Sequence, residues 1–499
     1  MIDDPRQDIA RLIDEGQPVG DDEVDPAEER DDAVPAEGGD GGGGPPVPQA
    51  WGFDVPRLNA EWALVLMGSK AVIVHEQESG PIEDRVRVLT VDAFKAWFLN
   101  RPTQIVGSDG KIKVITWADA WLRARDRRQY RGIEFKPSPT PEPPTKDYLN
   151  LWRGFAVKPK AKKNGYAVLR DHMLNNACGG DEVLFRWVFA WFAHIVQRPR
   201  ERVGTSLILR GKMGTGKTKI GEVMGSLYPS HYFLVDDGRY VTGQFNAHMA
   251  SCLLLQAEEA VWAGDKNAEG RLKSLVTAKT QMIESKGVDP IRLENFVRLM
   301  MTSNEDWVIP AGKDERRFCV LDIDPRCAQN HDYFREMDEE LDDGGREALL
   351  HDLLAFDLST VNLRRIPLTK ALLEQKLRSL DSVESWWLER LYSGSTTRNS
   401  DRWNREIPSD VLFDDYILAA DRIGIRRKSE EIAFGIKMRK LVPDLVRVKR
   451  YCSDTARRRW AYALPTLDEC RNAFSAEVGQ DLGWPHDDAA SDPMTSEML

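Results

Sequence analysis

The sequence has no long hydrophobic run and few cysteines in its 499 residues. No stretch reaches the roughly 18 apolar residues of a membrane span, and the acidic start MIDDPRQDIARLIDEG has no apolar segment, so we expect neither a membrane span nor a secretory signal. The six cysteines are scattered, with no CxxC pair and no histidine at zinc-finger spacing. We therefore expect a cytoplasmic protein without a disulfide framework or a structural zinc site.

Charge is distributed unevenly along the chain. The net charge of −11 lies mostly in residues 1–50, which carry 15 Asp and Glu against 3 Arg and are rich in Gly and Pro. Such a composition cannot bury enough apolar surface to offset the entropy of ordering, so we expect a disordered acidic tail there. Residues 426–460 instead hold 12 Lys and Arg against 4 Asp and Glu, which suits a polyanionic partner.

Composition and periodicity divide the remaining chain into six parts. The runs WALVLMGSKAVIVHE and VDAFKAWFLN predict two strands and a helix, and KPSPTPEPPTKDY predicts an extended spacer. Strand-like and helix-like runs alternate in the middle of the chain, which predicts an α/β core with a largely parallel sheet. The parts are a small α/β region (51–135), the spacer and a helical segment (136–203), the α/β core (204–325), a helical connector (326–380), a basic, mainly helical domain (381–470) and a C-terminal segment with an acidic tail (471–499).

The most specific motif is a glycine-rich loop between an apolar strand, LIL, and a helical pattern. Its glycines let backbone N–H groups and the helix N-terminus point at phosphates. Lys217 would reach the β- and γ-phosphates of ATP, and the Thr218 hydroxyl would bind Mg²⁺. A chance glycine-rich turn rarely contains the whole GxxxxGKT pattern in this context. The expected ATP-binding residues are Gly211, Lys212, Met213, Gly214, Thr215, Gly216, Lys217 and Thr218.

Polar side chains at the ends of two later strands complete the expected site. In SCLLLQAEEA a buried strand precedes Glu258, to which we assign Mg²⁺ binding, and Glu259, to which we assign activation of the attacking water. Asn304 ends the strand-like run FVRLMMTSN and would hold that water. Two adjacent glutamates more often form a solvated patch, but the buried strand and the upstream loop favour catalysis here.

In this order, GKMGTGKT, LLLQAEE, MTSN and DERRF resemble the Walker A, Walker B, sensor and arginine-finger motifs of superfamily 3 helicases, which are P-loop AAA+ ATPases. The runs QAEEAVWAGDK, LKSLVTAKTQMIESKG and TSNEDWVIPAGKDERRF resemble, more narrowly, the helicase domain of phage and plasmid primase-helicases, distantly similar to the poxvirus primase-helicase. The resemblance covers about residues 145–325. It implies that Arg316 or Arg317 is the finger and that Lys273 and Lys286 contact DNA in a central channel. Without it, these arginines and lysines are ordinary surface groups.

Two features depart from that family. The Walker B position commonly filled by Asp is Glu258, whose extra methylene changes its reach. The residues between Trp51 and the spacer are too few for a primase-polymerase domain, so we expect no primer synthesis by this chain alone. The pair Asp322 and Asp324 follows the finger, and we expect it to be structural.

The basic C-terminal region predicts a second DNA contact. The helix-like EEIAFGIKMRKLV precedes a hairpin-like VRVKRYCSDTARRRWAYAL, which is consistent with a winged-helix-like domain. Arg457, Arg458 and Arg459 would then contact phosphates. A solvated basic face covering the core explains the same charges equally well.

These motifs predict an ATP-dependent DNA helicase or translocase of phage or plasmid replication, an ATP hydrolase that uses Mg²⁺. The resemblance implies a homohexamer on single-stranded or forked DNA, with a separate primase or polymerase as a further partner, in the host cytoplasm if the chain is phage-encoded. The alternative is a nucleotide-switched AAA+ loader that remodels protein partners without unwinding DNA. The nucleotide-binding motifs do not distinguish the two functions, and the basic residues favour DNA.

Overall fold

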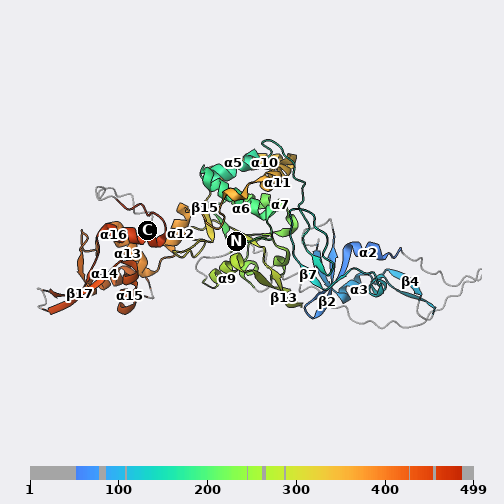
Figure 1. The fold of residues 1–499 in the computed structure, drawn as a ribbon, viewed down its shortest axis with the longest axis horizontal. Coiled ribbons are helices and arrows are strands. Elements are labelled where there is room, and N and C mark those ends of the chain that lie inside the picture. Colours follow the sequence, from blue (N-terminus) through green and yellow to red (C-terminus); the bar gives the residue numbers. More distant parts are fainter. Residues whose placement is uncertain are drawn as a thin grey trace, which may run out of the picture. The chain divides into compact units, whose positions relative to one another are not determined.

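The computed structural model describes residues 52–77, 86–106, 110–243, 246–260, 266–285, 288–425, 428–452 and 457–485 (Figure 1). The expected acidic tail (1–50), the end of the C-terminal segment and Lys286 lie outside these residues. Within them, no helix is both long and apolar enough to cross a membrane. The five cysteines whose side chains are described are free and buried.

Five parallel strands form the central sheet, which confirms the predicted α/β core. Its elements are β9 (Ser206–Arg210), α7 (Lys217–Ser226), β10 (Tyr232–Val235), α8 (Gly238–Thr242), β11 (Leu254–Glu258), α9 (Lys266–Thr277), β14 (Arg298–Ser303) and β15 (Phe318–Asp322). The strand order is β10-β11-β14-β9-β15. The crossovers through α7 and α9 run in opposite directions along the sheet, so right-handed connections place these helices on opposite faces (Figure 1).

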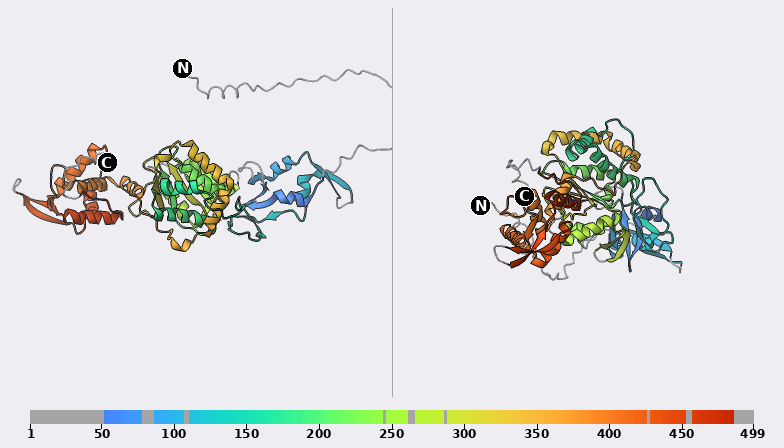
Figure 2. Two further views of the ribbon diagram at one scale, coloured as in Figure 1. Left: turned by 90° about the horizontal axis from the view of Figure 1, so that it is seen from above. Right: turned by 60° about the vertical axis from the view of Figure 1, so that its left-hand side comes forward.

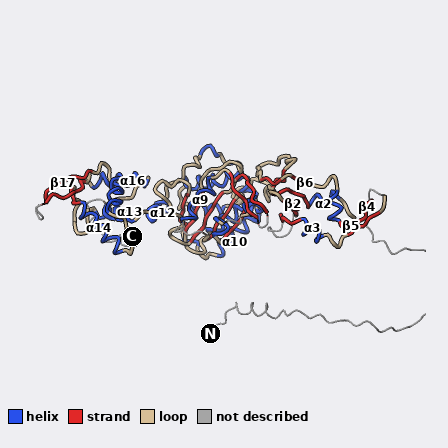
Figure 3. Tube along the Cα trace, turned by 90° about the horizontal axis from the view of Figure 1, so that it is seen from below, coloured by secondary structure: helices blue, strands red, loops and turns tan. Residues whose placement is uncertain are grey.

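Helices from before and after these strands complete the hydrophobic core around the sheet, and Figure 3 shows helices enclosing the central strands. They are α5 (Ala167–Asp171), α6 (Glu182–Gln197), α10 (His331–Glu340) and α11 (Arg346–Ala355). The helix α6 is buried along most of its length, as its apolar sequence predicts, and it packs against α11. Residues expected to form a connector after the core therefore belong to it.

The N-terminal region combines a small sheet, in the order β3-β2-β1-β6, with short helices. Its elements are α2 (Val55–Glu61), β1 (Trp62–Met67), β2 (Lys70–Glu76), β3 (Val86–Thr90), α3 (Val91–Trp97), β4 (Pro102–Val106), β5 (Ile112–Thr116), α4 (Trp117–Arg123) and β6 (Gln129–Tyr130). Side chains of β1 alternate between two cores: Trp62 packs with Phe94 and Trp121, whereas Ala63 and Val65 join the core of the central sheet.

The Pro-rich spacer is bridged by backbone pairing. Before it, β7 (Gly132–Glu134) pairs in parallel with β8 (Tyr148–Asn150) after it. Phe135 and Leu149, from the two sides, belong to the core of the central sheet. The spacer is therefore a loop at the edge of that core.

The C-terminal part has a hydrophobic core of its own. It follows α12 (Lys370–Arg378), whose Ala371 and Leu372 belong to the core of the central sheet. Its own elements are α13 (Ser382–Ser393), β16 (Glu406–Pro408), α14 (Ser409–Arg422), α15 (Glu431–Leu441), β17 (Val446–Cys452), β18 (Arg457–Ala463) and α16 (Leu467–Val478). The strands form an antiparallel sheet in the order β16-β18-β17. The predicted helix and hairpin correspond to α15 and β17–β18, and α16 adds a helix to the same core.

Candidate functional site

The carboxyl ends of β9, β11 and β14 meet at one edge of the central sheet. Both β9 and β11 pair in parallel with β14, so that Arg210 lies beside Ser303 and Glu258 beside Thr302. The glycine-rich loop follows Arg210 directly, and Asn304 follows Ser303. Ligands of parallel α/β sheets bind at this edge, because helix N-termini and strand-end side chains face it. Three segments far apart in the sequence are thus brought together.

Lys217, the first residue of α7, is held inside the loop. Its Nζ donates hydrogen bonds to the carbonyl oxygens of Gly211 (2.6 Å) and Lys212 (2.8 Å) and to Oδ1 of Asn304 (2.7 Å). Burial lowers the pKa of Lys217, and the negative charges of Glu259 and Glu258 act in the opposite direction. The ammonium group therefore links the loop after β9 to the residue that ends β14.

Gly216, at the start of α7, requires glycine for two reasons. Its φ is 83°, in the left-handed region that disfavours side chains. A Cβ atom there would lie 2.6 Å from Nε2 of His172 and 2.7 Å from the ring of Phe334. His172 is buried, and burial lowers its pKa. Sequence reasoning missed His172, because nothing in its own segment indicates that it packs beneath the loop.

The two adjacent glutamates have separate partners. Glu258 accepts a hydrogen bond from the Thr218 hydroxyl (2.5 Å). Glu259 accepts from the Ser303 hydroxyl (2.9 Å) and from the backbone N–H of Asn304 (2.6 Å). Its φ of 48° is uncommon for a residue with a Cβ atom, and backbone strain of this kind concentrates at functional sites. Glu259 is therefore fixed against the end of β14, whereas Glu258 faces the start of α7.

The oxygen atoms of Thr218 and Glu258 form a small donor set for a hard cation. Mg²⁺ is commonly held by one or two carboxylates together with water and substrate phosphates. Within the described ranges, no cluster of three or more His, Cys, Asp or Glu residues forms a complete metal cage. The donor set therefore fits a cation that arrives with a phosphate ligand.

Arg316 and Arg317 lie at the opposite edge of the sheet. They precede β15, whose first residue, Phe318, pairs with Ser206 at the start of β9. The five residues of β9 span about 16 Å, so neither arginine reaches the loop of its own chain. Buried Glu315 accepts the backbone N–H groups of Arg316 (2.9 Å) and Arg317 (2.7 Å) and lies 3.6 Å from the Arg317 guanidinium. The Arg316 side chain is exposed and forms no polar contact within the described residues.

Of the two lysines expected to contact DNA, the structure describes only Lys273. Lys286 comes after β12 (Thr280–Ser285) and before β13 (Val288–Glu294) in the sequence and is outside the described residues. Lys273 on α9 is half-buried, forms an ion pair with Glu269 and lies 4.0 Å from Glu315. Lys273 therefore has carboxylate partners within the chain.

Arg458 and Arg459 lie on different faces of the hairpin. Successive residues of β18 point to opposite faces, so Arg458 faces away from Arg459. Arg459 lies 3.7 Å from Asp410, and the side chain of Arg457 is outside the described set. The predicted phosphate contacts at Arg458 and Arg459 are therefore divided between two faces.

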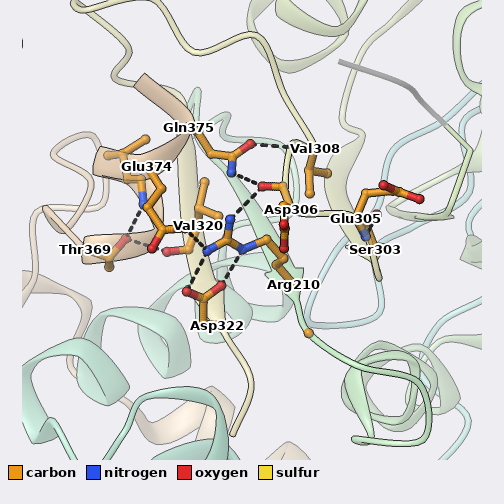
Figure 4. Close-up of polar contacts among 12 residues, drawn as sticks. Arg210, Ser303, Glu305, Asp306, Val308, Val320, Asp322, Thr369, Glu374 and Gln375 are labelled. Atoms are coloured by element: carbon orange, nitrogen blue, oxygen red, sulfur yellow. Dashed lines mark hydrogen bonds and ion pairs between the residues drawn. The ribbon is translucent and has the colours of Figure 1, made fainter. Parts of the chain in front are cut away.

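Sequence reasoning also missed Arg210, the residue before the loop. Its buried guanidinium donates to both carboxylate oxygens of Asp322 (2.6 and 2.8 Å), to Glu374 (2.5 Å) and to the carbonyl oxygen of Asp306 (2.6 Å) (Figure 4). Burial alone would lower the pKa of Arg210, but hydrogen bonds to Asp322 and Glu374 raise it. Asp322 thus has the structural role that the sequence predicts. The sequence did hold a signal for Arg210, because it is a charged residue at the end of an otherwise apolar strand.

Helix α12 holds the segment that follows Asn304. Buried Gln375 donates to the Asp306 carbonyl oxygen (2.6 Å) and accepts from the Val308 N–H (2.8 Å) (Figure 4). Thr369, which precedes α12, donates to the carbonyl oxygen of Val320 in β15 (2.5 Å). These contacts join the segment after Asn304 and the strand β15 to the helix that leads into the C-terminal part.

Comparisons with known proteins found a matching family model, a curated relative and solved structures of similar fold. Residues 209–317 match a family described as a family of unknown function (DUF5906). A curated relative, the DNA primase-polymerase of Nitratiruptor phage NrS-1, is 26% identical over 179 residues, or 35% of this chain. That match covers 25% of the length of the phage protein.

Two solved structures of the NrS-1 C-terminal region are similar to this chain in fold. An apo structure covers 83% of this chain and 99% of its own, with a TM-score of 0.58 and 16% identity. An A form apo structure covers 82% of this chain and 98% of its own, with a TM-score of 0.59 and 14% identity. At these identities the likeness establishes the fold alone.

Proposed function

We propose that this chain is an ATP hydrolase of the P-loop AAA+ class and superfamily 3 type, which drives helicase or translocase movement on DNA during phage or plasmid replication. The observation that carries the proposal is the convergence of Lys217, Thr218, Glu258, Glu259 and Asn304 at one edge of the parallel sheet. Such a set combines a phosphate-binding cation, a metal-binding pair and a carboxylate that can accept a proton. The sequence similarity to a phage DNA primase-polymerase supports a role in phage DNA replication.

Each residue of the site has a distinct task in this proposal. The backbone of residues 211–218 holds the phosphates of ATP, and Lys217 exchanges its carbonyl partners for phosphate oxygens. Thr218 and Glu258 hold Mg²⁺, which when bound neutralises charge on the phosphates. Glu259 accepts a proton from the attacking water, and its bonds to Ser303 and Asn304 keep its carboxylate in place.

A neighbouring subunit completes the site in this proposal. Arg316 is exposed and lies at the far edge of its own sheet, so it can act only on the nucleotide of another chain. An arginine placed in trans stabilises the charge that develops on the transferred phosphoryl group. A hexameric ring, which the family that this chain resembles forms, provides such a neighbour for every site.

DNA is the proposed partner of the ring. Lys286, between β12 and β13, is the proposed contact in the central channel, where a lysine tracks phosphates without reading sequence. The C-terminal order α13-β16-α14-α15-β17-β18, with β16 completing the sheet, supports a winged-helix domain. Replication of phage DNA implies the host cytoplasm, with primer synthesis supplied by a separate primase or polymerase.

Steady-state ATP hydrolysis with and without single-stranded DNA tests the proposal. We expect DNA to stimulate hydrolysis and Lys217→Ala to abolish it. Hydrolysis indifferent to DNA would instead favour the loader that remodels protein partners. Arg316→Ala should lose turnover while retaining ATP binding, and Arg335→Ala, an exposed arginine on α10, is the matched control. Full turnover by both Arg316→Ala and Arg317→Ala would refute the completion of the site in trans.

A further inference from the structure

The hairpin β17–β18 has two faces of different chemistry. Directly paired residues of antiparallel strands share a face, and the pairs Lys449–Trp460 and Tyr451–Arg458 alternate with the pair Arg450–Arg459. On the first face Tyr462, opposite Arg447, packs in the core, and the residues Arg447, Lys449, Tyr451, Arg458 and Trp460 are here called the cationic face. In the left view of Figure 2 the red hairpin projects from the helices of the C-terminal part.

Carboxylates neutralise the opposite face. Arg450 and Arg459 lie directly across from each other, an arrangement in which like charges destabilise a sheet. Arg450 donates to both carboxylate oxygens of Glu406 (2.9 and 2.7 Å), and Arg459 lies 3.7 Å from Asp410. The arginines of this face therefore have partners within the chain.

The cationic face differs in its polar partners. Among the described residues, no carboxylate forms an ion pair with Arg447, Lys449 or Arg458. Arg447 and Lys449 lie 5.1 and 4.9 Å from the ring centroid of Trp460, and Arg447 donates to the Ser409 hydroxyl (3.2 Å). Both aromatic rings remain accessible, since Trp460 is 44% exposed and Tyr451 is 68% exposed. Uncompensated cations beside exposed rings mark a surface for an external anionic ligand.

We propose that the cationic face binds single-stranded DNA. Its cations would hold the phosphates, while Tyr451 and Trp460 offer ring faces on which unpaired bases stack. In a duplex the base faces are already stacked on each other, so a duplex would use only the cations. The choice of single-stranded DNA as the ligand rests on the proposed function. The contact itself is assigned to a hairpin that packs on a different hydrophobic core from that of the nucleotide site.

Binding of a labelled single-stranded 30-mer of mixed sequence to the full chain, measured by fluorescence anisotropy without nucleotide, tests the proposal. The variant Lys449→Ala/Arg458→Ala removes two charges from the cationic face. The control Arg450→Ala/Arg459→Ala removes two charges from the other face of the same hairpin and also leaves Glu406 and Asp410 without partners. If only net charge mattered, the control would lose at least as much affinity.

We expect the first variant to lose affinity about tenfold and to reduce the slope of log K against log salt by about 1.4, or about 0.7 for each lost phosphate contact. The control should keep its slope and lose less than about twofold. Tyr451→Leu should weaken binding about fivefold or more, and Tyr451→Phe, which keeps the ring, should not.

Equal losses from the two double variants would overturn the proposal, and so would unchanged affinity of Tyr451→Leu. A loss confined to a duplex of the same length would also overturn it, in favour of a duplex contact. The proposed ATPase function is tested separately, by ATP hydrolysis and its loss in Lys217→Ala. The nucleotide-free DNA-binding assay does not involve either measurement, so the two proposals can fail independently.

Discussion

Replacing Arg210 with methionine tests whether this residue joins the nucleotide-site edge to α12. The guanidinium side chain is 8% exposed and connects the ends of β9 and β15 with α12 and the Asp306 carbonyl (Figure 4). Methionine fills a similar volume without donating hydrogen bonds. The substitution therefore removes the charge and leaves Asp322 and Glu374 without their shared partner.

The expected loss follows from the exposure of those carboxylates. Removing one partner of a fully buried ion pair costs about 3–5 kcal/mol of unfolding free energy. The side chains of Asp322 and Glu374 are each 47% exposed, so water replaces part of the lost interaction. We therefore expect a loss of about 2–3 kcal/mol. At about 2–4 °C per kcal/mol for a domain of this size, Tm should fall by about 4–12 °C.

Thermal and urea unfolding followed by circular dichroism measures this loss. Arg378→Ala is the matched control, because Arg378 also contacts Asp306 (3.2 Å) but its side chain is 48% exposed, and we expect it to cost less than about 1 kcal/mol. Arg210→Lys keeps the positive charge but not the planar guanidinium, so its loss of unfolding free energy should lie between those of Arg210→Met and Arg378→Ala. The reasoning would be refuted if the free energy of unfolding of Arg210→Met were within about 0.5 kcal/mol of that of the unmodified chain, or if Arg378→Ala lost as much as Arg210→Met.

Three further predictions concern single residues. Glu259→Gln can still hydrogen-bond to Ser303 and Asn304, so it should bind ATP normally and lose about 10²–10⁴-fold in turnover, and unchanged turnover would remove Glu259 as the base. Gly216→Ala introduces a Cβ against His172 and should abolish ATP binding, measured by titration with a fluorescent nucleotide. Burial lowers the pKa of His231 to about 4, while its Nδ1 bonds to Ser251 and its Nε2 accepts from the Arg153 N–H. In the unfolded chain the histidine pKa is about 6.5, so as the pH falls the unfolded state binds the proton before the folded state does. The contribution of neutral His231 to the free energy of unfolding is therefore complete above about pH 6.5 and falls by about 1.4 kcal/mol for each pH unit below it, down to about pH 4. Urea unfolding of His231→Gln across that range should lack this slope, and an unchanged slope would assign it to other groups.

The sequence by itself determined the core of the candidate site. The glycine-rich loop, the two glutamates and Asn304 each follow an apolar strand, and strand, loop and helix patterns are properties of short segments. Because the strand ends of a parallel sheet meet at one edge, the order of these segments was enough to predict that their side chains lie together. The predicted helix and hairpin of the C-terminal part are local patterns of the same kind.

Only the tertiary structure decided which of these groups have partners. Arg210 and Glu374 are 164 positions apart, and His172 and Gly216 also come from segments far apart in the sequence, so no local pattern connects them. Lys273 has a partner, Glu269, one helical turn away, but its approach to Glu315 depends on how the core packs. Arg458 and Arg459 are adjacent in sequence, yet strand pleating places Arg459 on the face with carboxylate partners and Arg458 on the cationic face. A charged side chain is explained by its neighbours in space, and the packing of distant segments determines those neighbours.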